Sequence, residues 1–169
     1  MTDRALNFHI WARKASAAQT LSTDLNAAGY SAIPVPDLNA AIGAADIITT
    51  TTTATKPLFA DGLVRKGSHV TAIGADCPGK QELPTKLVAA ASLRVCDMAS
   101  QSLHHGEFQS AHRNDASLQV TELGHILSGE QIGRTSDEDI TVVDLTGIAA
   151  QDIAITQTII DAAAGAKAQ

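Results

Sequence analysis

Hydrophobic positions along the chain follow two periods that alternate with each other. Ala5–Ala12 alternates apolar and polar residues, which is typical of a strand. Apolar residues then recur three or four positions apart between Ala18 and Ala28, the spacing of one face of a helix. Gly29 follows where a helix end favours a left-handed backbone conformation. The first thirty residues therefore predict a strand followed by a helix.

The same alternation continues over the rest of the chain. Asp46–Thr53 is β-branched after its first residue and is typical of a buried strand. Residues 100–114 show no clear period, and the terminal GAKAQ is expected to fray. Further strands are predicted at Ser31–Val35, His69–Gly74, Leu93–Asp97 and Ile140–Leu145, and helices at Asp37–Gly43, Glu82–Ala91, Thr121–Leu127 and Ala149–Ala164.

Strands that alternate with helices predict an α/β fold, doubly wound around a mostly parallel sheet. In such sheets ligands bind beyond the carboxyl ends of the strands. Chemistry is therefore expected just after Thr53, Gly74, Asp97 and Leu145.

Composition narrows the class of partner. Lys and Arg number 12 against 18 Asp and Glu, so the net charge of −6 lacks the basic footprint of a nucleic-acid binder. Only 3% of residues are aromatic, which disfavours base stacking. No apolar run approaches the roughly 20 residues that cross a bilayer, and the N-terminus does not resemble a secretory signal. We expect a cytoplasmic protein with a small-molecule partner, bound neither to nucleic acid nor to a membrane.

The turn GADCPGK, residues 74–80, carries the strongest candidate for chemistry. Asp76 directly follows a predicted strand, where a carboxylate can accept or orient a substrate proton. The alternative is an ordinary strand-to-helix turn in which Asp76 bonds nearby backbone. Both interpretations stay open on the residues alone.

Other chemistry finds less support. The aperiodic stretch contains His104, His105 and His112 near Glu107. These residues could form a metal cluster or a solvated surface, and we expect no metal. The two cysteines, at positions 77 and 96, are too few for a disulfide framework and are expected to be non-catalytic thiols. No G-x-S-x-G, P-loop or G-x-G-x-x-G motif occurs, and the last absence argues against NAD.

Four sequence segments favour NAD binding instead: ADIITTTT (45–52), GSHVTAIGADCPGKQEL (67–83), ELGHILSGE (122–130) and GRTSDEDITVVDLTGIAAQD (133–152). In this order and spacing they resemble the ornithine cyclodeaminase/mu-crystallin family, which includes alanine dehydrogenases and ketimine reductases. The resemblance runs from about residue 8 to 161. It implies a partial Rossmann-like dinucleotide-binding domain over residues 1–148, with a C-terminal helix and tail over 149–169.

Compared with the family pattern, the chain starts near the second Rossmann strand. The resemblance implies that the first strand, its Gly-rich turn and the N-terminal substrate domain are absent. The strands at Ala5–Ala12 and Asp46–Thr53 would then face each other across a gap and uncover apolar side chains. We expect the two edges to close on each other or to be covered by another chain, giving a homo-oligomer.

The resemblance also assigns roles to single residues. Asp76 matches the family's catalytic aspartate, beside the substrate amine. Thr50, Thr52, Gly74 and Gly147 match positions at the cofactor. Arg13 falls where an acidic residue would bind the ribose of NAD, so a cation there favours the 2′-phosphate of NADP.

The implied reaction is NAD(P)-dependent hydride transfer at an amino-acid or imine carbon, either ornithine to proline plus ammonia or ketimine reduction. One hypothesis is a truncated enzyme that binds NAD(P) weakly or not at all and is inactive without its missing half. The other is a non-catalytic oligomerising or binding relic. A glycine-rich strand and turn encoded in frame before Met1 would favour the first.

Overall fold

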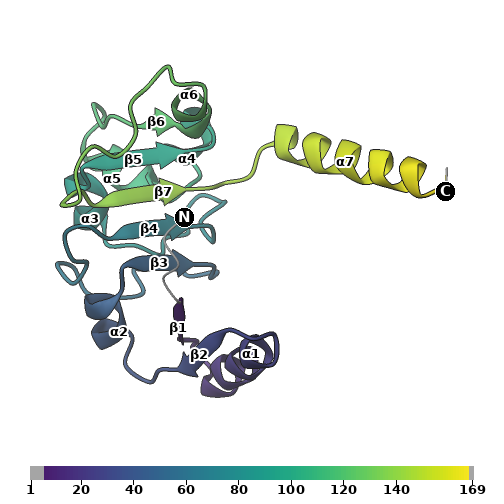
Figure 1. The fold of residues 1–169 in the computed structure, drawn as a ribbon. Helices are drawn as coiled ribbons and strands as arrows, with labels where there is room; N and C mark the ends of the chain where they lie inside the picture. The colour runs from purple at the N-terminus through teal and green to yellow at the C-terminus, as the bar shows by residue number, and fades with distance from the viewer. Residues whose placement is uncertain (1–5, 168–169) are drawn as a thin grey trace.

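The computed structural model describes residues 6–167 as alternating short strands and helices (Figure 1). The strands are β1 (Asn7–Ile10), β2 (Ser31–Pro34), β3 (Ile47–Thr50), β4 (His69–Ala72), β5 (Leu93–Cys96), β6 (Thr121–Glu122) and β7 (Thr141–Asp144). The helices are α1 (Ala15–Ala27), α2 (Leu38–Ala44), α3 (Thr85–Ala90), α4 (Ala99–Ser102), α5 (Gln109–Asn114), α6 (Leu123–Leu127) and α7 (Ala149–Lys167). This alternation confirms the predicted α/β class.

The strands form two parallel sheets. β1 pairs with β2 alone, while the larger sheet has five strands in the order β3-β4-β7-β5-β6. In the larger sheet Val70 of β4 lies opposite Ile48 of β3 and Val142 of β7, and all three side chains are buried. The core of the molecule is built around these residues together with Leu83 and Phe108.

The edges of β1 and β3 face a cavity instead of each other. The cavity has a volume of about 910 Å³ and is lined by residues of both strands and of α2. Of the two expected outcomes, closure of the edges on each other is therefore wrong, and cover by another chain stays a prediction. α2 connects β2 to β3 and lines this space with Leu38, Ala41 and Ile42, which keeps the two edges apart.

Local signals set several element ends as expected. After α1, Gly29 has φ +90°, its N–H donates to the Asn26 carbonyl, and the Tyr30 N–H donates to the Leu25 carbonyl. These are the two bonds of a Schellman motif, which ends a helix at a glycine. At α2, Asp37 accepts a hydrogen bond from the Ala40 N–H at 3.0 Å and caps the helix.

Three predicted elements differ from the structure. The helix expected from Glu82 begins only at Thr85, because Pro84 holds the chain extended at the N-cap position and disfavours helix before it. The stretch 100–114 contains parts of α4 and all of α5, which are too short to show a period. The helix expected over 121–127 is preceded by the two-residue strand β6, which forms because β5 offers it a partner edge.

Burial of β3 also departs from expectation. Ile48 and Thr50 are buried, but Ile47 is 63% exposed and Thr49 is exposed, so the strand has one open face. A strand covered on both faces would bury all four residues. Residues of both faces of β3 line the cavity.

α7 extends away from the body of the molecule (Figure 1). It continues to Lys167, so residues 165–167 of the predicted tail are helical, and residues 168–169 lie outside the described range. Every residue from Ala149 to Gly165 is exposed. Within residues 6–167, α7 and the other helices are too short or too polar to cross a membrane.

Candidate functional site

All predicted site residues except Arg13 lie at the carboxyl edge of the five-stranded sheet, and Arg13 follows β1 in the separate two-stranded sheet. Because the strands within each sheet run parallel, their carboxyl ends share an edge. Arg13 follows β1, Thr50 ends β3 and Thr52 comes just after it, Gly74 and Asp76 follow β4, and Gly147 follows β7.

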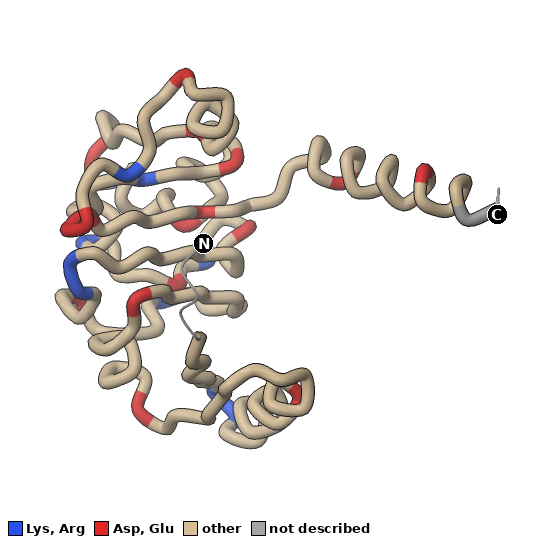
Figure 2. The backbone as a smooth tube through the Cα atoms, in the orientation of Figure 1, with Lys and Arg blue, Asp and Glu red and all other residues tan. Residues whose placement is uncertain are grey.

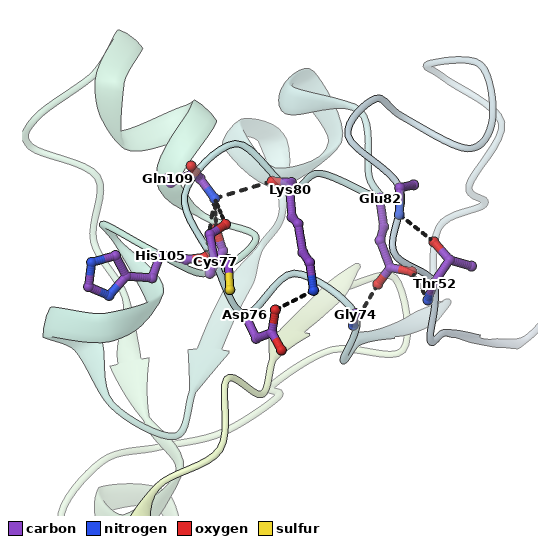
Figure 3. A network of polar contacts seen from close by, with 10 residues as sticks. Thr52, Gly74, Asp76, Cys77, Lys80, Glu82, His105 and Gln109 are labelled. Carbon is purple, nitrogen blue, oxygen red and sulfur yellow. Dashed lines mark hydrogen bonds and ion pairs between the residues drawn. The ribbon is translucent and has the colours of Figure 1, made fainter.

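Asp76 lies in the turn after β4 with its side chain half exposed. Its Oδ1 atom accepts a hydrogen bond from Lys80 Nζ at 2.5 Å, which is also an ion pair (Figure 3). This bond from Lys80, with a second from Cys77, lowers the pKa of Asp76 below its usual value. The carboxylate is therefore ionised at neutral pH and accessible to a ligand.

A single glutamine holds the turn that carries Asp76. Gln109, on α5, is buried, and its Nε2 atom donates to the carbonyls of Cys77 at 3.3 Å and Lys80 at 3.2 Å (Figure 3). Its Oε1 atom accepts from the Gly79 N–H at 2.9 Å. The backbone around Asp76 is thus fixed at three points by one side chain.

Glu82 joins the carboxyl ends of β3 and β4. Its side chain is fully buried and accepts a hydrogen bond from the Thr50 hydroxyl at 2.8 Å. It also accepts from the Thr52 N–H at 2.5 Å and the Gly74 N–H at 2.9 Å (Figure 3). Hydrogen bonds to a carboxylate are stronger than those between neutral groups. Glu82 therefore sets the position of both strand ends.

Gly74 lies where these two strand ends approach closely. A Cβ atom at this position would overlap the Thr52 carbonyl oxygen and would lie 2.6 Å from the Thr52 nitrogen and 2.7 Å from Glu82 Cδ. The need for glycine here is steric. The Thr50 hydroxyl is likewise turned inward to Glu82, whereas Thr52 is half-buried at the surface.

Two more buried carboxylates continue the network. Glu107 accepts from the N–H groups of Glu82 at 2.9 Å and Leu83 at 2.7 Å, and burial raises its pKa to about 8. Asp144, at the end of β7, accepts from the Ser102 hydroxyl and from the Glu107 N–H, and burial raises its pKa to about 6. A chain of carboxylate-to-backbone bonds therefore runs from β7 to the ends of β3 and β4.

Gly147 is held by a separate carboxylate. Its φ is +82°, a conformation that favours glycine, and its N–H donates to Asp97 Oδ2 at 2.6 Å. Asp97 also accepts from the Thr146 hydroxyl at 2.9 Å. Asp97 follows β5, so it ties the loop after β7 to the neighbouring strand.

The described part of the chain contains neither a metal-binding cluster nor an activated cysteine. Among residues 6–167, no group of three or more His, Cys, Asp or Glu side chains is placed to hold a metal ion. His104 and His112 are stacked edge to face, with ring centroids 5.6 Å apart. Burial raises the pKa of the Cys96 thiol to about 12, and Asp76 raises the pKa of Cys77, so neither thiol is activated as a thiolate.

Sequence reasoning placed Asp76 at a strand end but missed Glu82, Glu107 and Gln109. Glu82 was expected to be the first residue of a helix, and the other two fall in the stretch without a period. The partners through which they hold the strand ends and the Asp76 turn lie 8 to 32 residues away, so no local pattern marks these roles.

Comparison with known proteins supports a common origin. The family model described as the ornithine cyclodeaminase/mu-crystallin family matches residues 5–167. A delta(1)-pyrroline-2-carboxylate reductase of Bacillus cereus is 40% identical over 139 residues, which are 80% of this chain and 42% of the relative. An iminosuccinate reductase of Paracoccus denitrificans is 38% identical over 123 residues, 70% of this chain and 37% of the relative. The chain thus spans less than half the length of these two relatives.

Solved structures agree with the sequences. An archaeal alanine dehydrogenase dimer with bound NAD superposes with a TM-score of 0.86 at 32% identity, over 94% of this chain and 50% of that one. The iminosuccinate reductase of Paracoccus denitrificans in complex with NAD+ gives the same TM-score and identity, over 95% of this chain and 50% of that one. The family model covers nearly the whole chain, and the fold agrees. The chain belongs to the ornithine cyclodeaminase/mu-crystallin family.

Proposed function

We propose that this chain forms the dinucleotide-binding part of an enzyme that transfers hydride between NAD(P) and an amino-acid or imine carbon. Relatives in the family are named as reductases of cyclic imines and of iminosuccinate and as an alanine dehydrogenase. The observation that supports the proposal most is the edge of the five-stranded sheet that Thr52, Asp76 and Gly147 share beyond the carboxyl ends of β3, β4 and β7. The dinucleotide-binding part is residues 1–148, with 149–169 as a C-terminal helix and tail.

The predicted site residues fit a dinucleotide in part. The exposed Arg13 supplies a cation for a phosphate group, as the 2′-phosphate of NADP requires. Thr52 and Gly147 lie at strand ends that Glu82 and Asp97 hold in place. The chain contains no G-x-G-x-x-G motif to hold the pyrophosphate, so we expect the chain alone to bind NAD(P) weakly.

Bound NAD(P) would accept or supply the hydride. Asp76 would act on the substrate nitrogen. Its ionised carboxylate, kept so by Lys80, favours a cationic amine or iminium group beside it and orients the proton on that nitrogen. Gln109 keeps the Asp76 turn in place through its three backbone bonds, so it is a positioning residue.

A chimera tests the role of Asp76. This chain would be joined to the complementary N-terminal portion of a related pyrroline-carboxylate reductase. Asp76→Asn should then lower turnover of Δ1-pyrroline-2-carboxylate by about 10²–10⁴-fold while dinucleotide affinity changes little. Cys77→Ser, in the same turn, serves as the control. Near-normal turnover of the Asp76→Asn enzyme would reduce Asp76 to a turn residue.

The alternative is a non-catalytic oligomerising or binding protein, favoured by the exposed isoleucines of α7, among them Ile153 and Ile159 at 69% and 62% exposure. Titration of the chain with NADPH, followed by amide chemical shifts, separates the two functions. The proposed function predicts weak binding that moves the amides of Thr52, Gly74 and Gly147. Unmoved amides at saturating NADPH, together with self-association by light scattering, would favour the alternative.

A further inference from the structure

The loop that joins β7 to α7, residues 145–148, lies at the carboxyl edge of the five-stranded sheet. At its start, the Leu145 N–H donates to the Ala72 carbonyl at 3.0 Å. Gly147 is exposed, and among the described residues nothing beyond its chain neighbours lies within 4 Å of the place that a Cβ atom would take. The exposed α7 then runs away from the sheet (Figure 1). Gly147 is therefore held in place by hydrogen bonds and not by packing around a side chain.

Asp97 and Gln101 supply the hydrogen bonds of this loop. Asp97 Oδ2 accepts from the Gly147 N–H at 2.6 Å, and its Oδ1 atom accepts from the Thr146 hydroxyl at 2.9 Å. Oδ1 also accepts from the N–H of Met98 at 2.9 Å. Gln101 Nε2 donates to the Gly147 carbonyl and to the Thr146 hydroxyl, both at 3.0 Å. The N–H and the carbonyl of Gly147 are thus both bonded by side chains of one short segment after β5.

No basic side chain of this loop competes for the Asp97 carboxylate. Residues 145–166 contain no Lys or Arg, and Figure 2 shows acidic but no basic positions along α7. Asp97 forms no ion pair with any described residue. Hydrogen bonds to a carboxylate are stronger than those between neutral groups. The charge of Asp97 therefore acts on the loop itself.

The segment that holds this loop also reaches the Asp76 turn. The Gly106 N–H donates to the Gln101 carbonyl at 3.2 Å, and the Gly106 carbonyl accepts from Gln109 Nε2 at 2.9 Å. A Cβ atom at Gly106 would lie 2.7 Å from Thr146 Cγ2, so the loop packs closely against this glycine. Gln109 in turn bonds the backbone of the Asp76 turn. Hydrogen bonds through Gln101, Gly106 and Gln109 therefore connect the loop after β7 to the turn after β4.

We propose that Asp97 and Gln101 are positioning residues for the bound dinucleotide, which hold the Gly147 loop in the conformation that receives the cofactor. The inference rests on the proposed function, in which Gly147 lies at the cofactor. Because both backbone polar groups of Gly147 are already bonded, the loop offers the ligand a fixed shape and not a free donor or acceptor. A loop that is ordered before binding spares the ligand the cost of ordering it.

Asp97→Asn removes the clamp with little change in volume. If the amide oxygen takes the Oδ1 position, the NH₂ group faces the Gly147 N–H, which then has no acceptor. If the oxygen takes the Oδ2 position, the Met98 N–H loses its acceptor instead. Either placement leaves one backbone donor unpaired, so the segment and the loop can no longer both be held.

Asp139→Asn is the matched control at the opposite end of β7. Asp139 is half-buried, as Asp97 is, and precedes the strand. Its Oδ2 atom accepts the same set of donors, namely the N–H groups of Thr135 at 3.1 Å and Ser136 at 2.9 Å and the Thr135 hydroxyl at 3.2 Å. The two variants therefore lose the same kind of hydrogen bonds, one at each end of the sheet.

Titration of the full chain with NADPH compares the variants with the unmodified protein. The amides of Thr52 and Gly74, which Glu82 holds, report binding because neither substitution touches them. Asp97→Asn should bind NADPH about three- to ten-fold more weakly, since the ligand must then order the loop. Asp139→Asn should bind as the unmodified protein does, although urea titration should show a similar loss of stability in both variants.

Gln101→Ala gives a second test that leaves the carboxylate in place. It removes the bonds to Thr146 and to the Gly147 carbonyl and should also weaken NADPH binding. The double variant with Asp97→Asn should lose less affinity than the product of the two single losses, because both residues act through one loop. Losses that multiply in full would overturn the shared role.

The outcomes separate this inference from the proposed function. Amides of the unmodified protein that do not move with NADPH would overturn the proposed function, and this inference with it. Binding by the unmodified protein that Asp97→Asn and Asp139→Asn retain equally would overturn this inference alone. If Asp97→Asn does not fold, Gln101→Ala decides: unchanged NADPH affinity in that variant contradicts a positioning role for the pair.

Discussion

Replacement of Glu82 by glutamine measures how much the three hydrogen bonds of its carboxylate contribute to the free energy of unfolding. Glu82 Oε2 accepts two donors, the Thr50 hydroxyl and the Gly74 N–H, and Oε1 accepts the Thr52 N–H. A glutamine keeps one acceptor oxygen. Its best placement puts that oxygen at the Oε2 position, which satisfies Thr50 and Gly74 but sets an NH₂ group against the Thr52 N–H. One lost donor costs about 1–3 kcal/mol in free energy of unfolding.

Glu82→Ala removes all three acceptors and should cost about 3–9 kcal/mol, since each unpaired buried donor costs about 1–3. That loss approaches a typical total stability of about 5–15 kcal/mol, so little of this variant should fold. Glu130→Gln, at an exposed carboxylate, should change stability by less than about 0.5 kcal/mol. Urea titrations of the three variants and the unmodified protein give the comparison.

The ranking of the three variants is the critical result. If Glu82→Gln unfolds at the same urea concentration as Glu130→Gln, the three hydrogen bonds of Glu82 do not stabilise the fold, and the role given to Glu82 is wrong. A Tm lowered by about 2–12 °C for Glu82→Gln corresponds to the expected range for a protein of this size. Amide shifts of Thr52 and Gly74 should move together in this variant, because the carboxylate joins them.

Three further predictions concern other parts of the site. Gly74→Ala should lower the free energy of unfolding by about 1–3 kcal/mol or more, because its Cβ meets Thr52 and Glu82. Its control, Gly43→Ala, lies in open space on α2 and should raise the free energy of unfolding by about 0.5–1 kcal/mol. Equal urea midpoints for the two variants would contradict the packing at Gly74. Because the pKa of Glu107 is raised to about 8, the native state binds more protons than the unfolded state between pH 4.5 and 8. The free energy of unfolding should therefore fall by about 1–2 kcal/mol from pH 6.5 to 8. Glu107→Gln should flatten this pH profile. Asp144 acts in the same direction mainly below this window, since its pKa is about 6, and a flat profile in the unmodified protein would refute the assignment. NADPH should bind about ten-fold more tightly than NADH, and Arg13→Ala should remove the difference; equal affinities would leave Arg13 a surface charge.

Features set by neighbouring residues were predictable from the sequence. The Gly29 turn and the start of the helix at Asp37 depend on residues within five positions, and both appear where the pattern placed them. The position of Asp76 beyond β4 followed from the same logic, because a strand end can be read from its own residues. The gap beside β3 also followed, since the family resemblance supplied the strand order.

The network behind the site was not predictable, for a physical reason. Glu82 sits in a segment whose local pattern indicates a helix, and its actual conformation depends on Pro84 and on bonds to Thr50 and Thr52. Gln109 shows no local signal at all, although it fixes the Asp76 turn from 30 residues away. Long-range hydrogen bonds decide such positions, and residue periodicity carries no information about them.

α7 has a consequence for how the protein comes apart. All of its residues from Ala149 to Gly165 are exposed, so the helix rests on its own backbone ladder and on no tertiary packing. Isolated helices are marginally stable in water, and this one should melt and re-form on its own while the sheet stays intact. A protease at low concentration should therefore trim the chain within 149–167 and leave a resistant core that ends near β7. Resistance of that segment equal to the core would show that α7 is already held by a partner in solution.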